Sequence, residues 1–199
     1  ELLNSKLNLI NMKKDFILFP EAGIKIINAF PALYIEKISA VVVADLHLGY
    51  EGFKAEKEGL AIPKVQYKEI VSLFKKILKR FEKPKYLIIA GDIRPGFGEL
   101  TIHEYLEVRD FLDFAKERFE EVIVCRGNHD NYVVGVATRK GVEFPSEKCI
   151  DRFLFCHGDN LPETSESEFD YLIMGHEHPA LTLRSEIGIK EKIKCFLYG

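Results

Sequence analysis

The residues of this chain best suited to chemistry are its histidines, because five of the six lie among Asp, Asn, Glu and Gly in short segments. Carboxylates, amide oxygens and imidazoles are the groups with which proteins hold divalent metal ions. His103 alone lies outside these segments. Together the segments resemble one metal site, and they are Asp45-Leu46-His47, Gly91-Asp92, Gly127-Asn128-His129-Asp130, His157-Gly158-Asp159 and Gly175-His176-Glu177-His178.

The spacing within two of these segments predicts shared ligation. Asp45 and His47 are two residues apart, and side chains at that spacing lie on the same side of an extended backbone. We therefore expect them to bind one cation together, and His176 and His178 repeat the spacing. Asp92 stands alone after Gly91, and its two carboxylate oxygens could bridge two metals.

Two further segments complete the predicted donor set. Asn128 offers an amide oxygen and His157 an imidazole. Mixed nitrogen and oxygen ligation of this kind favours Mn, Fe or Zn over Ca or Mg. We expect two divalent ions, Mn in the first place, with Fe, Zn, Ni or Mg as alternatives. No cysteine lies among the donors, which argues against a structural zinc or iron–sulfur site.

A pair of metals predicts phosphoester hydrolysis. Two ions ~4 Å apart clamp the attacking and leaving oxygens of an in-line displacement. They also lower the pKa of a shared water, so that hydroxide is available near neutral pH. Because the cations offset the negative charge of the substrate, no covalent nucleophile on the protein is required.

Short apolar runs that read as β-strands precede the segments and must position them. Strands are expected at residues 16–19, 32–35, 40–44, 86–90, 122–125, 152–156, 171–174, 180–184 and 194–198. An amphipathic helix is expected from Pro63 to about Phe81 and a second over residues 102–118, with a glycine-containing loop before the first. The alternation of strand and helix predicts parallel pairing in the first half. The expected fold is α/β, two mixed sheets packed face to face with helices outside.

Composition excludes several other classes. The chain has 199 residues and a formal net charge of −3, which gives no global argument for nucleic acid or a membrane. No apolar stretch is long enough to span a membrane, and four cysteines without a C-x-x-C pair indicate buried free thiols in a reducing cytoplasm. Residues 1–11 are expected to be an upstream extension, and residues 12–199 one domain, cut short at its C-terminal end.

Taken together and in order, the motifs resemble those of calcineurin-like metallophosphoesterases, especially the small SbcD-related phosphoesterases. Ala-Asp-Leu-His-Leu-Gly at residues 44–49 and Gly-His-Glu-His-Pro-Ala at 175–180 carry the latter resemblance. The resemblance implies a four-layer α-β-β-α sandwich. It implies one metal bound by Asp45, His47, Asp92 and His178. It implies a second metal bound by Asp92, Asn128, His157 and His176. His129 matches the catalytic histidine, which would protonate the leaving oxygen.

One position departs from the family pattern. Many relatives carry an Asp or His three residues after the Gly-Asp aspartate, where it partners the catalytic histidine. This chain has Pro95 there, so Asp130, Glu99 or another carboxylate must take over, or His129 acts with less support. Arg94, beside Pro95, is a candidate for binding substrate phosphate, with an ordinary ion pair as the alternative.

The predicted function is hydrolysis of phosphodiesters in a nucleotide-like or nucleic-acid substrate. The alternatives are a non-catalytic scaffold with the same fold and a nuclease subunit of a DNA-repair machine. A basic run between Lys75 and Lys85 could touch nucleic acid, although its place on the polar face of an amphipathic helix favours a solvated surface. The aromatic residues Tyr50, Phe53 and Phe97 flank the motifs and could stack on a substrate or pack the loops down.

Overall fold

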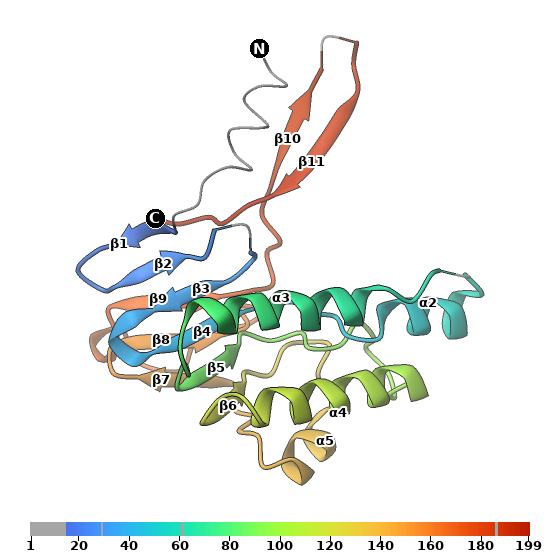
Figure 1. Cartoon of the computed structure of the whole chain (residues 1–199), viewed down its shortest axis with the longest axis horizontal. Coiled ribbons are helices and arrows are strands. Elements are labelled where there is room, and N and C mark those ends of the chain that lie inside the picture. Colours follow the sequence, from blue (N-terminus) through green and yellow to red (C-terminus); the bar gives the residue numbers. More distant parts are fainter. Residues whose placement is uncertain (1–14, 29, 61, 186) are drawn as a thin grey trace.

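The fold of the chain is taken from a computed structural model. It describes residues 15–28, 30–60, 62–185 and 187–199 (Figure 1). The expectation for residues 1–11 lies outside this part of the chain. A six-stranded sheet, a three-stranded sheet and a separate β-hairpin make up the described strands.

The six-stranded sheet has the spatial order β1-β2-β3-β4-β5-β6 and is mixed. Strands β1 to β4 pair antiparallel, whereas β4, β5 and β6 pair parallel. The parallel pairing predicted for the alternating strands and helices is therefore confirmed. The strands are β1 (Phe16–Phe19), β2 (Ile24–Ile26), β3 (Leu33–Ile35), β4 (Ala40–Val43), β5 (Tyr86–Ile89) and β6 (Glu121–Val124), with a 3-10 turn η1 (Glu36–Ile38) before β4.

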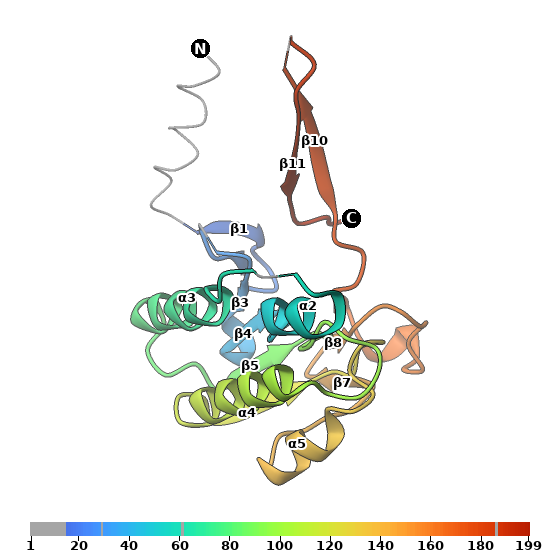
Figure 2. The ribbon, with the colours of Figure 1, turned by 90° about the vertical axis from the view of Figure 1, so that its right-hand side faces the viewer.

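Helices cover one face of this sheet and the second sheet covers the other (Figures 1 and 2). Val43, Ile89 and Val124 pack in a core with the helices, whereas Val42, Ile88 and Ile123 pack in a core with the second sheet. Burial on both faces explains why these strands are apolar throughout. The helices are α2 (Tyr50–Glu58), α3 (Gln66–Arg80), α4 (Ile102–Lys116) and the short α5 (Val134–Arg139).

The three-stranded sheet is also mixed, which confirms the predicted class of two mixed sheets and helices. Its order is β7-β8-β9, antiparallel between the first two strands and parallel between the last two. Phe153 and Phe155 point inward to the core, whereas Leu172 and Met174 on the outer side are 41% and 46% exposed. In the described residues no α-helix covers this outer side. The elements are β7 (Glu147–Ile150), β8 (Phe153–Cys156), η2 (Glu166–Glu168) and β9 (Tyr171–Met174).

The helix α2 replaces the loop predicted between Gly49 and Gly59. The two glycines are its caps, and both adopt the left-handed backbone with φ of 85° and 68°. Inside the helix, the missing side chain of Gly52 lets His103 approach, since a Cβ there would lie 2.3 Å from the Cβ of His103. Glycine is common in loops, so the glycines at both ends of this short helix lead to the prediction of a loop.

The helix predicted from Pro63 begins later, at Gln66, because a distant residue caps it. The buried carboxylate of Glu51 in α2 accepts hydrogen bonds from the backbone N–H groups of Val65 and Gln66, at 3.1 and 2.8 Å. The helix predicted at 102–118 does begin at Ile102, behind a capping box formed by Thr101 and Glu104. A local signal thus fixed the start of α4, and a tertiary contact fixed the start of α3.

The last two strands, β10 (Ala180–Arg184) and β11 (Lys190–Lys194), form a hairpin that projects from the body of the fold. The first matches its prediction. The second differs from the strand expected at 194–198. The turn between Ser185 and Ile189 pairs Arg184 with Lys190, so the charged residues Lys190–Lys194 form the strand. Charged residues are accepted in β11 because both strands are exposed along their length.

Two compositional expectations can be compared with the described residues. Cys125 and Cys156 are buried free thiols as expected, but Cys149 is exposed, since its side chain lies on the outer side of the three-stranded sheet. Among the helices that the structure describes, none combines the length and apolar character that crossing a bilayer requires.

Candidate metal and catalytic site

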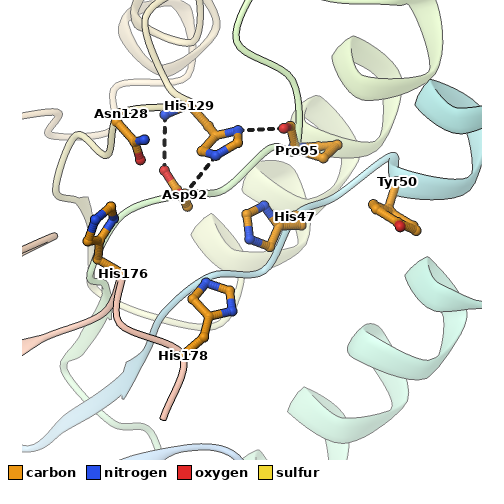
Figure 3. A pocket seen from close by; sticks show the side chains of 8 residues that line it. All are labelled: His47, Tyr50, Asp92, Pro95, Asn128, His129, His176 and His178. Atoms are coloured by element: carbon orange, nitrogen blue, oxygen red, sulfur yellow. Dashed lines mark hydrogen bonds and ion pairs between the residues drawn. The ribbon is translucent and has the colours of Figure 1, made fainter. Parts of the chain in front are cut away.

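A cavity of about 290 Å³ lies where the predicted segments meet (Figure 3). Its lining contains six of the predicted site residues, namely His47, Asp92, Asn128, His129, His176 and His178, together with Tyr50 and Pro95. The remaining predicted ligands adjoin these residues: a carboxylate oxygen of Asp45 lies 3.3 Å from Nε2 of His178, and Nε2 of His157 lies 3.3 Å from Oδ2 of Asp92. The structure thus brings all eight residues together.

The carboxyl ends of neighbouring strands position these side chains. Asp45 follows β4, Asp92 follows β5 and Asn128 follows β6, and these three strands are parallel neighbours. Backbone hydrogen bonds tie the first two loops together, from Asp45 N to Gly91 O at 3.1 Å and from His47 N to Asp92 O at 3.1 Å. The loops after β8 and β9 approach the same edge from the second sheet.

The conformation of these loops differs from the extended Asp-x-His geometry expected from the sequence. Five predicted ligands have a left-handed backbone, with φ of 53° at Asp45, 46° at His47, 52° at Asp92, 69° at His176 and 44° at His178. Asp and His enter this region more readily than most side chains, although at an energetic cost. The side chains converge because each strand ends in a tight turn, and the expectation of an extended backbone is wrong.

Glycines before the ligands allow the loops to approach one another. A Cβ at Gly127 would lie 2.2 Å from Oδ1 of Asp92, and one at Gly91 would lie 2.3 Å from Nδ1 of His157. Both distances are far inside van der Waals contact. The glycines of the Gly-Asp and Gly-Asn-His motifs are therefore required by packing, because a larger residue would collide with the neighbouring loop.

One group of donors contains Asp45, His47 and His178. A carboxylate oxygen and two ring nitrogens, one from each residue, all lie within 4.8 Å of one another. The Nδ1–H of His47 donates to the backbone carbonyl of Arg94 at 3.2 Å, which leaves its Nε2 lone pair free for a cation. Two imidazoles and a carboxylate are a donor set that Mn, Fe or Zn accepts.

A second group surrounds the buried His157. Its Nε2 lies 3.2 Å from Oδ1 of Asn128, 3.1 Å from Nδ1 of His176 and 3.3 Å from Oδ2 of Asp92. Its Nδ1–H donates to the carbonyl of Ala90 at 3.1 Å, so in the neutral imidazole the lone pair lies on Nε2, toward these three atoms. Donors held at ~2.1 Å from one ion lie about 3 Å apart, and this spacing fits a divalent cation.

The two groups share the carboxylate of Asp45. Oxygens of Asp45 and Asp92 lie within 4.8 Å of a ring nitrogen of His157 and of each other. The resemblance implied Asp92 alone as the bridge, whereas the structure places Asp45 against both groups. The carboxylate of Asp45 is thus within reach of imidazoles of both groups, whereas that of Asp92 adjoins His157.

The electrostatics of the site favour positive charge. Burial on its own would lower the pKa of His157, but its contact with Asp92, the Ala90 carbonyl and the charge of Asp45 together raise that pKa to about 9. For Asp92, burial would raise the pKa, but His157 and the backbone N–H of His129 outweigh burial and lower it. A cation, whether proton or metal, is therefore stabilised between these residues.

The catalytic candidate His129 has a partner that the sequence did not reveal. Its Nδ1–H donates to the backbone carbonyl of Pro95 at 2.5 Å, and its Nε2 faces Oδ2 of Asp92 at 3.6 Å. The ring of Phe97 covers one face of the imidazole, with a centroid distance of 3.7 Å. The expectation that proline leaves His129 unsupported is wrong, because the main chain of Pro95 orients the ring.

The carboxylates considered as substitutes do not take this role. Asp130 is buried and accepts hydrogen bonds from the backbone N–H groups of Ile93 and Gly127, at 3.1 and 3.0 Å. Burial raises the pKa of Asp130 to about 7, which is consistent with a structural position in the turn after β6. Glu99 contributes its backbone carbonyl to Arg94.

Arg94 corrects another expectation. The side chain is fully buried, and its Nε lies 2.9 Å from Oε1 of Glu104, which is also fully buried. It donates further to the carbonyl of Gly98 at 2.6 Å, while the N–H of Gly96 donates to Oε1 of Glu104 at 3.1 Å. With its guanidinium committed in this way, Arg94 is not presented to a substrate phosphate. Instead the ion pair anchors the loop that carries Pro95 and Phe97 to His129.

We expect Arg94→Met to destabilise the fold by about 3–5 kcal/mol, because the carboxylate of Glu104 would remain buried without its partner. Urea denaturation measures this change. The double variant Arg94→Met/Glu104→Gln should recover much of the loss, since both charges are then removed. If the single variant were as stable as the unchanged protein, this ion pair would not contribute to the stability of the fold.

Sequence reasoning missed the backbone acceptors of the site. The carbonyls of Ala90, Arg94 and Pro95 orient His157, His47 and His129 in turn. Every residue has a backbone carbonyl, so the sequence does not indicate which of them accepts a hydrogen bond from a histidine. The contact of Phe97 with His129 had a weak signal, an aromatic residue in a Pro/Gly loop beside a motif.

Two mixed sheets with Asp, Asn and His gathered at the strand ends define a class, the metal-dependent phosphoester hydrolases. The sequence model of the calcineurin-like phosphoesterase family matches residues 38–164. This match covers more than half of the chain, and the chain belongs to that family. It spans the predicted ligands from Asp45 to His157 and ends before His176 and His178.

Solved structures that are similar to this chain are distant in sequence. The nuclease MPE of Pseudomonas putida is 21% identical, with a TM-score of 0.59, and the match covers 84% of this chain and 74% of that chain. A protein of unknown function from Aquifex aeolicus, AQ665, is 19% identical with a TM-score of 0.44, over 70% and 78% of the two chains. The comparison with curated proteins found no match. At 21% identity the likeness to the nuclease concerns the fold alone.

Proposed function

We propose that this chain is a dinuclear phosphodiesterase for nucleotide-like or nucleic-acid substrates. The observation that carries this proposal is the pair of donor groups on either side of Asp45 and Asp92, next to an oriented His129. The first metal would be held by Asp45, His47, Asp92 and His178. The second would be held by Asp92, Asn128, His157 and His176, with Mn as the expected ion and Fe, Zn, Ni or Mg as alternatives.

When bound, two such ions supply a water of lowered pKa and offset the charge of the phosphoester. The residues of the chain supply orientation and a proton. Because the Nδ1–H of His129 is held by the Pro95 carbonyl, its Nε2 faces the cavity. In its protonated form this nitrogen would stabilise the developing charge and then protonate the leaving oxygen. Asn128, which also lines the cavity, would add an amide contact to the substrate.

The complete donor set supports an enzyme over a scaffold. A non-catalytic member of the fold has no need to keep seven candidate ligand side chains and an oriented imidazole in one cluster. The left-handed backbone at five of these residues costs stability, and such a cost persists where a function depends on it.

The direct test is an assay of the purified protein with Mn on an aryl phosphodiester, an aryl phosphomonoester, nucleotides and single-stranded DNA. We expect metal-dependent turnover, faster for the diester than for the monoester. Metal analysis should find two ions per chain. Absence of turnover on all four substrates would refute the enzyme, and a protein that binds no ions would favour the scaffold.

Metal removal gives a readout that does not depend on activity. The carboxylates of Asp45 and Asp92 lie close together, so their repulsion is relieved by cations. A saturating metal should therefore raise the melting temperature, since a ligand at a hundred times its Kd adds ~2.7 kcal/mol per site. Thermal scans with Mn and with a chelator measure the difference. An identical melting temperature in both would contradict the metal site.

A further inference from the structure

The β10–β11 hairpin leaves the body of the fold at the edge of the candidate site. Its first strand begins at Ala180, two residues after His178. Both views show the hairpin projecting away from the two packed sheets (Figures 1 and 2). Both strands are exposed along their whole length. The hairpin therefore extends the site outward as a two-stranded ribbon.

The strand register gives the ribbon two different faces. Residues directly opposite each other in an antiparallel pair lie on the same face. One face carries Ala180, Thr182 and four cations, Arg184, Lys190, Lys192 and Lys194, and it has no acidic residue. The other face carries Leu181, Leu183, Glu191 and Ile193. In a chain of net charge −3, this face concentrates positive charge that composition alone does not predict.

We propose that the cationic face of the hairpin binds the phosphate backbone of a nucleic-acid strand that enters the candidate site. This inference rests on the proposed function and narrows its substrate to a polynucleotide. Alternate residues of a strand are ~7 Å apart, so the cations on this face form a regular row along the ribbon. The four cations lie in the first, third and fifth residue pairs of the hairpin, counted from His178, and so extend along the whole ribbon, farther than a single nucleotide in the cavity would reach.

The composition of the second face favours nucleic acid over a lipid surface. A membrane-bound amphipathic segment keeps its cations at the headgroups and buries the face opposite to them. The face opposite the cations here carries Glu191 among Leu181, Leu183 and Ile193, so burying it would bring a carboxylate into the bilayer. A polyanion that contacts only the cationic face requires no such burial.

The test is binding of fluorescently labelled single-stranded DNA to the full chain, measured by anisotropy over a range of salt concentrations with metal removed to prevent cleavage. The test variant neutralises the cationic face with Arg184→Gln, Lys190→Gln, Lys192→Gln and Lys194→Gln. We expect at least about a tenfold loss of affinity at moderate salt. The slope of log affinity against log salt should fall by about 3, since each phosphate contact contributes about 0.7.

A matched control removes the same charge elsewhere. Four exposed lysines lie on α3 and just after it, and the control variant is Lys75→Gln, Lys76→Gln, Lys79→Gln and Lys83→Gln. This variant should keep most of the affinity. Equal losses in the two variants, or no loss in the hairpin variant, would overturn the proposal. So would binding of the hairpin to anionic phosphatidylserine vesicles without binding to DNA.

Different results would refute the hairpin surface and the proposed function. Turnover of a small aryl phosphodiester should be the same in the hairpin variant and the unchanged protein, which also shows that the variant is folded. Turnover with hairpin-independent DNA binding would refute the hairpin surface alone. Hairpin-dependent DNA binding without turnover of any phosphoester would refute the proposed function and leave the surface.

Discussion

Asp92→Asn should lower metal-dependent phosphodiester turnover on the order of 10³-fold, with fewer than two ions bound per chain. Asp92 is buried and presents Oδ2 to both His157 and His129, at 3.3 and 3.6 Å. Asparagine keeps the size and one carbonyl oxygen but loses the negative charge. The same carboxylate thus faces both an imidazole of the donor set and the candidate catalytic imidazole.

Asparagine is chosen because Asp92 also has a structural task. Its Oδ1 accepts a hydrogen bond from the backbone N–H of His129 at 3.1 Å, and an amide oxygen can take over that contact. The fold should therefore survive. Steady-state kinetics with metal analysis of the same samples measure the effect, and Asp110→Asn, at an exposed aspartate of α4, is the control. Two bound ions and undiminished turnover in Asp92→Asn would exclude a bridging role.

His129→Ala should lower turnover by about 10²–10⁴-fold while both ions remain bound. The loss should depend on the leaving group. A nucleoside leaving group needs a proton as its bond to phosphorus breaks, whereas a nitrophenolate is stable without one. We therefore expect a large loss for a dinucleotide and a much smaller loss for a nitrophenyl diester.

The control for this variant is His103→Ala, since His103 is the histidine outside the site motifs and does not line the cavity. Equal losses of His129→Ala on both substrates would show that His129 acts before the leaving group departs, for instance in binding. A variant that also loses its metal would show that His129 contributes to ligation. Either outcome would remove the assigned role of proton donor.

The sequence predicted the chemistry of the site better than its geometry. His47 and His178 were expected at one metal because their types and order match a pattern, and the structure places them beside Asp45. The strands before them were expected from apolar runs, and β4 and β5 lie where those runs predict. Both inferences depend on local composition, which a sequence displays directly.

Three of the failures share a physical cause, which is that contacts between separate segments decided the outcome. Glu51 sets the start of α3 from another helix, and Glu104 draws Arg94 into the interior. The Pro95 carbonyl orients His129 from a position where the side chain alone argued against a partner. Caps, burial and backbone acceptors depend on which segments meet, and no window of neighbouring residues contains that information.

The short segment from Ala90 to Pro95 has a consequence for how this site tolerates mutation. Its main-chain oxygens set the tautomers of three imidazoles, and a point substitution does not delete a peptide oxygen. The path of the backbone therefore determines the tautomers, and the identity of the neighbouring side chains does not. The site should therefore be most sensitive to substitution of buried residues such as Arg94 and Glu104, which fix the path of this segment. The imidazoles should keep their orientation when neighbouring side chains are changed.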